Sequence, residues 1–350
     1  MRIVSFVMVL ALLLSVLTFG GCRGGGSQRY QAESFAYFDT VTTVIGYAES
    51  EKKFLDEVAL IFEMLGEYHR LFDIYHAYDG IENLYTVNEL QNGVHRTVTV
   101  DARIIALLQF AKDMYTKTNG ALHIGMGSVL SIWHTHREAA LQSPDTPTVP
   151  LDAELAAAAA HTSLDHLVID SENSTVTITD PQMTLDLGAI AKGYAAECAA
   201  KELAARGLSH YVLNVGGTVR TVGARADGRA WVVGIEQPAV NTASPYLAEV
   251  TVVDRALSTS GSYQRYYMMN GVRYHHIVDP KTNKPATGYL SVSVLAEDTA
   301  LADALSTALF CMSIEEGTAL LNEYPDAAAL WVRDDGTQYK SARFDAFLKK

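Results

Sequence analysis

The sequence predicts an α+β fold in one domain, with a mixed, largely antiparallel sheet and flanking helices. Two observations support this prediction. Apolar residues recur at helical spacing through most of the first half, whereas short β-branched and aromatic runs separated by turn residues fill the second half. No internal repeat and no Pro/Ser-rich linker separates the halves, so we expect them to share one core.

The first residues have the composition of a secretory signal. Arg2 precedes an apolar run at 3–19, and Gly20-Gly21-Cys22 follows it. We predict a lipoprotein signal peptide at 1–21 and a flexible tether at 22–30, with Cys22 lipidated and inserted in the membrane. The folded domain at 31–350 is then extracytoplasmic and membrane-anchored. The alternative is an uncleaved N-terminal anchor, which places the domain on the same side.

The composition limits the partners that the protein can have. Its 350 residues include 27 Lys and Arg against 40 Asp and Glu, a net charge of −13. Such an excess of negative charge argues against nucleic acid as a partner. An anionic ligand would need local cations, which favours a bound metal. Cys198 and Cys311 lie in apolar helical runs, so we expect buried free thiols and no disulfide.

Helices dominate the prediction for the first half. Apolar side chains from Phe54 to Leu71 recur at helical spacing. Asp101 is an expected N-cap, and Asn119-Gly120 ends the helix that follows it. The predicted elements are a strand at 38–47 and helices at 51–72, from 102 to the Asn119-Gly120 stop, at 126–140 and at 156–160.

Short strands dominate the prediction for the second half. A long apolar helix at 300–321 is expected near the end of the chain. The predicted strands lie at 167–170, 175–179, 211–215, 219–222, 230–235, 248–253, 291–295 and 328–332.

The segment from Leu185 to Tyr194 is the strongest candidate for a ligand site. We expect an apolar strand to end here, turn at Gly188 and continue as a helix. A helix start presents free N–H groups and partial positive charge to an anion, and Lys192 adds a full charge. Asp186 and the nearby carbonyls offer hard oxygens to a cation, so the segment suits a phosphate with a divalent metal. The alternative is a junction whose small residues only allow close packing.

Further polar motifs follow. Asn214–Thr218 favours a tight turn. The hydroxyls of Ser258–Tyr263 suit either a phosphate or an exposed hairpin. His275 and His276 lie in a β-rich stretch, where one faces in and the other out. Asp303 and Thr307 share one helical face and suit Mg²⁺, the alternative being an ordinary polar face.

Taken in chain order, these motifs resemble those of the ApbE family of FAD:protein FMN transferases. The matching segments are Leu185–Gly193, Asn214–Thr218, Thr259–Tyr263, His276–Pro280 and Asp303–Thr307. The pattern Asp-Leu-Gly-x-Ile-Ala-Lys-Gly is highly specific, and the resemblance covers nearly all of the chain after the tether. Family members are often lipoproteins, and their α+β fold is often grouped with T-folds.

The resemblance implies roles for the residues on the phosphate and metal side. By position, Asp186 and Lys192 contact FAD. The resemblance also implies that the Ala189 carbonyl, Asp303 and Thr307 hold Mg²⁺, which makes Asp303 catalytic.

The resemblance also implies a catalytic base and a flavin side. His276 activates the incoming threonine, and Ile277 lines the flavin site. Phe38, Ala121, Leu122 and His123 pack around FAD, and Tyr75 stacks on a ring. Three positions depart from the usual family pattern: Phe38-Asp39-Thr40 replaces Met-Gly-Thr, His123 replaces an Asp, and Asn283 replaces a Gly.

The resemblance implies one reaction and leaves two alternatives. The family uses FAD and Mg²⁺ to transfer FMN to a threonine of an extracytoplasmic protein with an Asp-Gly-x-Thr-type motif, releasing AMP. The first alternative is Mg²⁺-dependent FAD hydrolysis to FMN and AMP, in which water replaces the threonine. The second is a non-catalytic flavin-binding lipoprotein, which would not need a base at His276.

Overall fold

The computed structural model describes residues 26–91, 93–238 and 244–350. Its main sheet has eight strands in the order β1-β2-β8-β9-β12-β17-β18-β19, and neighbouring strands pair antiparallel throughout this order. These strands are β1 (Gln28–Tyr37), β2 (Thr40–Ala48), β8 (Tyr211–Val215), β9 (Thr218–Val222), β12 (Ala256–Gly261), β17 (Tyr289–Ala296), β18 (Ala328–Arg333) and β19 (Gln338–Lys340).

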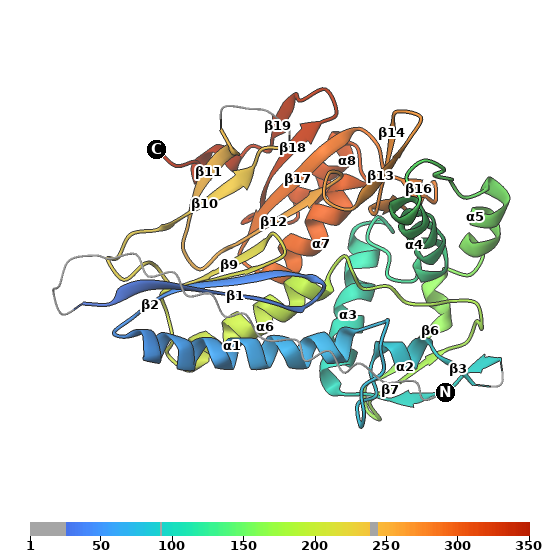
Figure 1. Ribbon diagram of the computed structural model, residues 1–350, viewed down its shortest axis with the longest axis horizontal. Helices are drawn as coiled ribbons and strands as arrows, with labels where there is room; N and C mark the ends of the chain where they lie inside the picture. The colour runs from blue at the N-terminus through green and yellow to red at the C-terminus, as the bar shows by residue number, and fades with distance from the viewer. Residues whose placement is uncertain (1–25, 92, 239–243) are drawn as a thin grey trace, which may run out of the picture.

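Three helices, α1, α6 and α7, pack against one face of this sheet (Figure 1). They bury an apolar stripe against inward-facing strand residues such as Val292 and Val294, as expected for amphipathic helices on a sheet. The described helices are α1 (Glu51–Phe72), α2 (Leu84–Asn88), α3 (Ala102–Lys117), α4 (Gly127–Gln142), α5 (Asp152–Ala159), α6 (Ala191–Ala205), α7 (Thr299–Phe310) and α8 (Ile314–Leu321).

The opposite face is covered by the hairpin of β10 (Trp231–Glu236) and β11 (Tyr246–Val252) and by a short 3₁₀ turn at Phe344–Phe347 (Figure 1). Leu295, between Val294 and Ala296 in β17, points into this second core because strand side chains alternate between faces. A small sheet has three strands in the order β5 (Val98–Thr99), β7 (Thr175–Ile178), β6 (Leu167–Asp170). Three further pairs are β3 (Leu90–Gln91) with β4 (Val94–His95), β13 (Tyr266–Met269) with β14 (Val272–His275), and β15 (Val278–Asp279) with β16 (Lys284–Pro285).

The structure confirms the predicted α+β class and most predicted elements. The exceptions occur where a helix cap or a side-chain hydrogen bond changes the local structure. The helix predicted at 300–321 is two helices, because Ser313 caps a new one with Glu316. The segment before Gly188 is not a strand; Asn88 holds Leu185 through two hydrogen bonds at 2.8 and 2.9 Å. The hydroxyl cluster at 258–260 lies inside β12.

The N-terminal predictions fall mainly outside the described residues. The signal peptide at 1–21 and Cys22 cannot be placed, and β1 begins at Gln28, within the segment predicted as a tether. In the ranges that the structure describes, no helix has both the length and the apolar character needed to cross a bilayer. Cys198 and Cys311 are free thiols, and both are partly rather than fully buried, which differs from the predicted burial.

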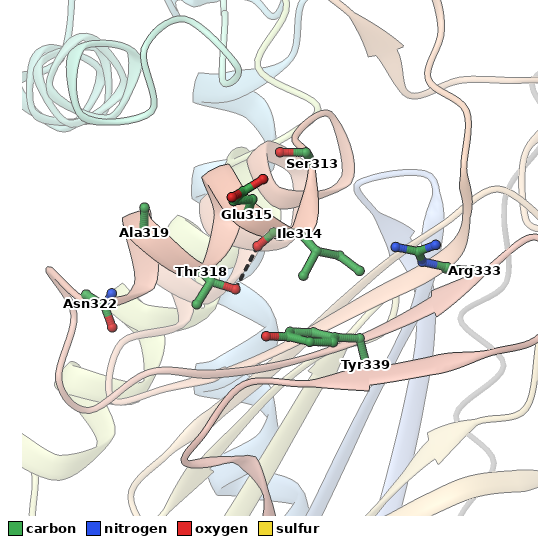
Figure 2. Close-up of a pocket in the computed structure, with 8 residues that line it drawn as sticks. All are labelled: Ser313, Ile314, Glu315, Thr318, Ala319, Asn322, Arg333 and Tyr339. Carbon is green, nitrogen blue, oxygen red and sulfur yellow. Dashed lines mark hydrogen bonds between the residues drawn. The ribbon is translucent and has the colours of Figure 1, made fainter.

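A surface cavity of about 560 Å³ opens between α8 and the β18–β19 hairpin (Figure 2). Figure 2 shows Thr318 turned back on its own helix, where its hydroxyl donates to the Ile314 carbonyl at 2.6 Å. A second cavity, of about 310 Å³, adjoins it through Ser313 and Arg333. Neither cavity is lined by any of the predicted site residues, so the candidate site is built below from contacts between side chains.

Candidate functional site

The contact between α6 and α7 brings two predicted motifs together. The Gly193 N–H donates to Asp303 Oδ2 at 2.9 Å, and both residues are buried. A Cβ on Gly193 would lie 2.5 Å from the Asp303 Cβ and 2.6 Å from the Thr299 carbonyl oxygen. Only glycine therefore allows this approach, which gives the glycine of the Lys192-Gly193 pair a steric reason.

A second contact one turn further along repeats the pattern. Glu197 follows Gly193 by four residues, and Thr299 precedes Asp303 by four, so the helices run antiparallel here. The buried Glu197 carboxylate accepts from the Thr299 N–H at 2.8 Å and hydroxyl at 2.9 Å, and pairs with Arg220 at 2.9 Å. Burial alone would raise the pKa of Glu197. The charge of Arg220 and these hydrogen bonds outweigh that effect, so the pKa lies below its usual value. The pair sets the register that places Asp303, and sequence reasoning missed it because Glu197 lies in an alanine-rich run.

Lys192 joins the turn before α6 to α7. Its ammonium donates to the Gly188 carbonyl at 3.1 Å and lies 4.0 Å from Asp303 Oδ2. The Asp186 carboxylate accepts from the Gly188 N–H at 2.8 Å. Burial raises the pKa of Asp186, and the Gly188 hydrogen bond and neighbouring cations oppose that rise. The structure thus places Asp186, Lys192 and Asp303 around one turn that also contains Ala189.

Hydroxyl groups complete the surroundings of Asp303. Oδ1 accepts from Ser258 at 3.0 Å and Thr218 at 3.3 Å. The Thr307 hydroxyl lies 3.2 Å from Ser260 Oγ and donates to the Asp303 carbonyl at 3.3 Å. Thr218 follows the tight turn predicted at 214–218, whose glycines Gly216 and Gly217 have φ of +60° and +89°.

This donor set fits Mg²⁺. In the described part of the chain, no group of three or more His, Cys, Asp or Glu side chains is arranged to hold a metal. The atoms that the structure brings together are the Asp303 carboxylate, the Thr307 hydroxyl and, through Lys192, the Gly188 carbonyl, which are all hard oxygens. Magnesium commonly takes few protein oxygens and keeps water or substrate phosphate as further ligands. A metal here would depend on Asp303 for its one charged protein ligand.

The two adjacent histidines have different surroundings, although β14 ends at His275 and His276 lies just beyond the strand in which both were predicted. His275 Nε2 contacts the Ala286 carbonyl oxygen at 2.7 Å and is buried. His276 Nδ1 is buried without a hydrogen-bond partner among the described residues. Burial, followed by the charges of Arg265, His275, Lys192 and Arg137, lowers the pKa of His276 to about 3. His276 is therefore a neutral imidazole whose buried Nδ1 has no partner among the described residues.

Tyr75 is connected to this region through α4. Its side chain is 54% exposed, and its ring centroid lies 6.1 Å from that of His134 on α4. Arg137, one turn further along α4, contacts His134 Nδ1 at 2.9 Å. The pKa of Tyr75 is raised by burial, then by Asp186, and lowered by Arg137. Tyr75 thus shares one neighbourhood with Asp186.

The other residues predicted around the flavin are less closely connected to this neighbourhood. Ala121 and Leu122 are buried in the core, as is Ile277, so ligand contacts through their side chains stay a prediction. The His123 ring packs edge-on against Tyr115 at 4.6 Å, and burial lowers its pKa to about 4. No described contact links His123 to Asp186 or Lys192.

Three basic residues near the predicted site had no part in the site prediction from the sequence. Arg265 follows the hydroxyl motif, and its carbonyl accepts the His276 N–H at 3.1 Å. Arg137 and His134 come from α4, which the sequence predicted as a helix without assigning these two side chains to the site. No local pattern marks such residues, because the tertiary fold alone brings them to the site. Together with Lys192, Arg265 and Arg137 provide the local cations that an acidic protein needs to bind an anion.

Comparison with known proteins identifies relatives of the whole domain. The model of the ApbE family matches residues 38–331. An FAD:protein FMN transferase of Vibrio cholerae is 34% identical over 255 residues, covering 72% of this chain and 74% of that protein. An FAD:protein FMN transferase of Treponema pallidum is 35% identical over 258 residues, covering 68% of this chain and 67% of that protein. The crystal structure of the ApbE protein of Thermotoga maritima superposes with a TM-score of 0.78 at 28% identity, covering 92% of this chain and all of that one.

Proposed function

This chain belongs to the ApbE family, and we propose from that premise that it is an FAD:protein FMN transferase. In the proposed reaction a threonine hydroxyl of an extracytoplasmic acceptor attacks the FMN-side phosphorus of FAD. A phosphoester bond forms, the bond between the two phosphates breaks, and AMP leaves. The names of the relatives support the transferase activity. The threonine acceptor, the requirement for Mg²⁺ and the release of AMP are the finer parts of the proposal.

One observation carries this proposal: Lys192, Gly193 and Asp303 meet at the α6–α7 contact. Lys192 supplies a positive charge and the turn at Gly188 supplies backbone groups at the start of α6, where a pyrophosphate would bind. Asp303, Thr307 and the Ala189 carbonyl would hold Mg²⁺, which when bound neutralises charge on the phosphates and on the departing AMP. Such stabilisation of developing charge is typically worth a factor of 10² to 10³ in rate per group.

His276 is the proposed base. Its imidazole is neutral and its buried Nδ1 has no partner in the described chain, so it can accept the threonine proton there. A pKa near 3 makes it a weak base in the free protein. An anion bound against Lys192 and Arg265 would offset two of the charges that lower this pKa. Substrate binding would therefore make His276 a stronger base when a proton has to be taken.

The test incubates the full mature chain with FAD, Mg²⁺ and a peptide bearing an Asp-Gly-x-Thr-type motif. Mass spectrometry showing FMN on the threonine together with free AMP supports the proposal. Free FMN and AMP with an unmodified peptide would instead support FAD hydrolysis. Bound, unchanged FAD would support a flavin-binding lipoprotein. A matched peptide with valine in place of the threonine controls for modification elsewhere.

The cellular location is a separate part of the proposal. The apolar run at 3–19 and Cys22 support export and lipidation, which would hold the enzyme on the extracytoplasmic side of a membrane beside its acceptor. Metabolic labelling with a radioactive fatty acid tests this directly. Label on the wild-type chain that is absent from Cys22→Ser supports the anchor, and equal labelling of both would refute it.

A further inference from the structure

The turn between β1 and β2 has an unusual backbone conformation. Tyr37 pairs with Thr40, so Phe38 and Asp39 form a two-residue hairpin turn. Both have positive φ, +54° for Phe38 and +50° for Asp39. Such turns strongly favour Asn-Gly or Asp-Gly, and a bulky side chain such as phenylalanine is rare at positive φ. Contacts from outside the hairpin must therefore hold this turn in place.

Two distant residues hold the turn, one on each side. The Phe38 N–H donates to Nδ1 of His69, on α1, at 3.2 Å, and the two rings lie edge to face at 5.5 Å. The Arg265 guanidinium donates to the Asp39 carbonyl at 3.0 Å. We call His69 and Arg265 the clasp. Both hydrogen bonds go to backbone atoms of the turn, so they fix its conformation whatever its side chains are.

The hydrogen bonds around His69 define its protonation state. Because Nδ1 accepts from Phe38, the ring is neutral and carries its hydrogen on Nε2. Nε2 lies 3.4 Å from the Tyr78 hydroxyl, which itself donates to the buried Asp73 carboxylate at 2.8 Å. The Phe38 N–H donates to His69 at one end of this series, and the Asp73 carboxylate accepts from Tyr78 at the other. A proton added at Nδ1 would point at the Phe38 N–H and break the series at the turn.

The groups that face His69 have opposing effects on its charge. Burial is the main cause that lowers the His69 pKa; the carboxylates of Asp73 and Asp39 raise it, and His76 and Arg70 lower it further. The net result keeps His69 neutral near pH 7. Acid would protonate His69 and so remove the acceptor that Phe38 needs.

The clasp is connected to three residues of the proposed site. Phe38 itself is in the turn. The carbonyl of Arg265 accepts the His276 N–H at 3.1 Å, so the same residue bonds both the turn and the proposed base. Asp73, at the end of the series, accepts the Tyr75 N–H at 2.7 Å. A movement of the turn would therefore disturb Phe38, Tyr75 and His276 together.

We propose that His69 and Arg265 are positioning residues that hold the Phe38–Asp39 turn in its flavin-binding conformation, and that protonation of His69 releases the turn. The identity of the ligand, FAD, rests on the proposed function. The hydrogen bonds of the clasp do not, so the structural part of the inference has an independent test.

The test measures FAD affinity by quenching of flavin fluorescence, with EDTA present to suppress turnover. His69→Phe removes the acceptor and should weaken FAD binding about tenfold at pH 7.5. His69→Asn places an amide oxygen near the position of Nδ1, so its affinity should stay within about threefold of wild type and should not change between pH 7.5 and 5.5. Wild type should lose affinity as the pH falls through the pKa of His69, which lies below 6.5. His166→Asn, at a histidine far from the turn, should follow the wild type at every pH.

A second measurement covers the case in which the Phe variant fails to fold. Nitrogen-15 NMR of the wild-type chain should show His69 with an unprotonated Nδ1 at pH 7.5, and Tyr78→Phe should change that signal while leaving the fold intact. A His69 protonated on Nδ1 at pH 7.5 would overturn the inference, as would undiminished FAD affinity in a folded His69→Phe. Absence of FAD binding in the wild type at every pH would refute the proposed function instead, and the NMR result would still decide whether the clasp exists.

Discussion

The α6–α7 contact and the β1–β2 turn hold the two sides of the candidate site by different physical means. At the α6–α7 contact the backbones approach because Gly193 has no side chain, and buried carboxylates accept backbone N–H groups directly. At the turn, each of two residues with positive φ depends on one hydrogen bond: the Phe38 N–H donates to His69, and Arg265 donates to the Asp39 carbonyl. The first arrangement is set by packing and the second by individual polar contacts.

The difference predicts unequal responses to change. A packed contact has no low-energy alternative, since separating the helices removes the donors that the buried Asp303 and Glu197 carboxylates have on the facing helix. A strained turn has an alternative, since it can relax once a clasp bond is lost. We therefore expect substitutions at the α6–α7 contact to have large effects and substitutions in the turn to have small, pH-dependent ones.

The largest effect is expected for Asp303→Asn, which keeps the size of the side chain and removes its charge. Its carboxylate accepts three hydrogen bonds and would supply the charged ligand to Mg²⁺. We expect FMN transfer to fall at least 100-fold, in line with the loss of a charge-stabilising group. Asp298→Asn is the matched control on the same helix, because asparagine caps a helix as well as aspartate does. Equal activity of the two variants would remove the metal assignment.

Gly193→Ala should come next, because it tests packing without changing any charge. The added Cβ would overlap Asp303 and the Thr299 carbonyl, so the helices must separate. We expect a loss of about 1–3 kcal/mol in the free energy of unfolding, the usual cost of overpacking, together with a severe loss of transfer. Urea denaturation measures the first quantity.

The control for this variant is Gly207→Asn. Unlike Gly193, Gly207 lies at positive φ, +73°, but a Cβ there meets no atom within 4 Å, and asparagine tolerates that conformation. A Gly193→Ala protein as stable and as active as Gly207→Asn would show that the α6–α7 contact is not limited by packing at Gly193.

The same comparison explains how much of the site could be predicted from the sequence. Gly193, Lys192 and Asp303 lie in short local motifs, and the chemistry of those motifs indicated phosphate and metal before any fold was known. The fold class and helices such as α1 followed from periodicity, because an amphipathic helix carries its own pattern. The segment at 185–187 was wrongly predicted as a strand because its partner is a side chain, Asn88, and not another strand.

The clasp had no comparable signal. His69 lies in the last turn of α1 and Arg265 in a tyrosine-rich loop, and neither position is distinctive in the sequence. Their role depends on contacts 31 and 226 residues away along the chain. The departure at Phe38-Asp39 was visible, but the sequence alone did not show which groups compensate for it.

Acidification should affect stability by a moderate amount. Burial lowers the pKa of His69, of His123 to about 4 and of His276 to about 3. Above about pH 6.5 these three histidines are mainly neutral in both the folded and the unfolded chain, so they do not reduce the free energy of unfolding. As the pH falls below 6.5 the unfolded chain binds protons that the folded chain does not, and stability decreases. Each such histidine lowers the free energy of unfolding by at most about 1.4 kcal/mol for every unit by which the pH falls.

Urea midpoints at pH 7, 6 and 5 measure this effect. His123→Phe removes one of the titrating rings and keeps an aromatic contact with Tyr115, so its stability should fall less steeply with pH than that of the wild type. Parallel curves for the two proteins would mean that His123 is protonated as easily in the folded chain as in the unfolded one.

The smallest effect is expected for Asp39→Gly, and its sign is opposite to the others. Glycine reaches positive φ without the steric cost that aspartate meets, although it loses more conformational entropy on folding. The net gain in the free energy of unfolding should be about 0.5 kcal/mol, while Asp39→Ala, which keeps the strain and loses the local polar group, should cost about as much. The bond from Arg265 goes to the backbone carbonyl of residue 39, so all three proteins keep it. A stability order of Gly, Asp, Ala from guanidinium denaturation would show that backbone strain dominates at this position. If alanine were instead the most stable, the charge of Asp39 would be the destabilising feature, and the turn would need no clasp to hold its conformation.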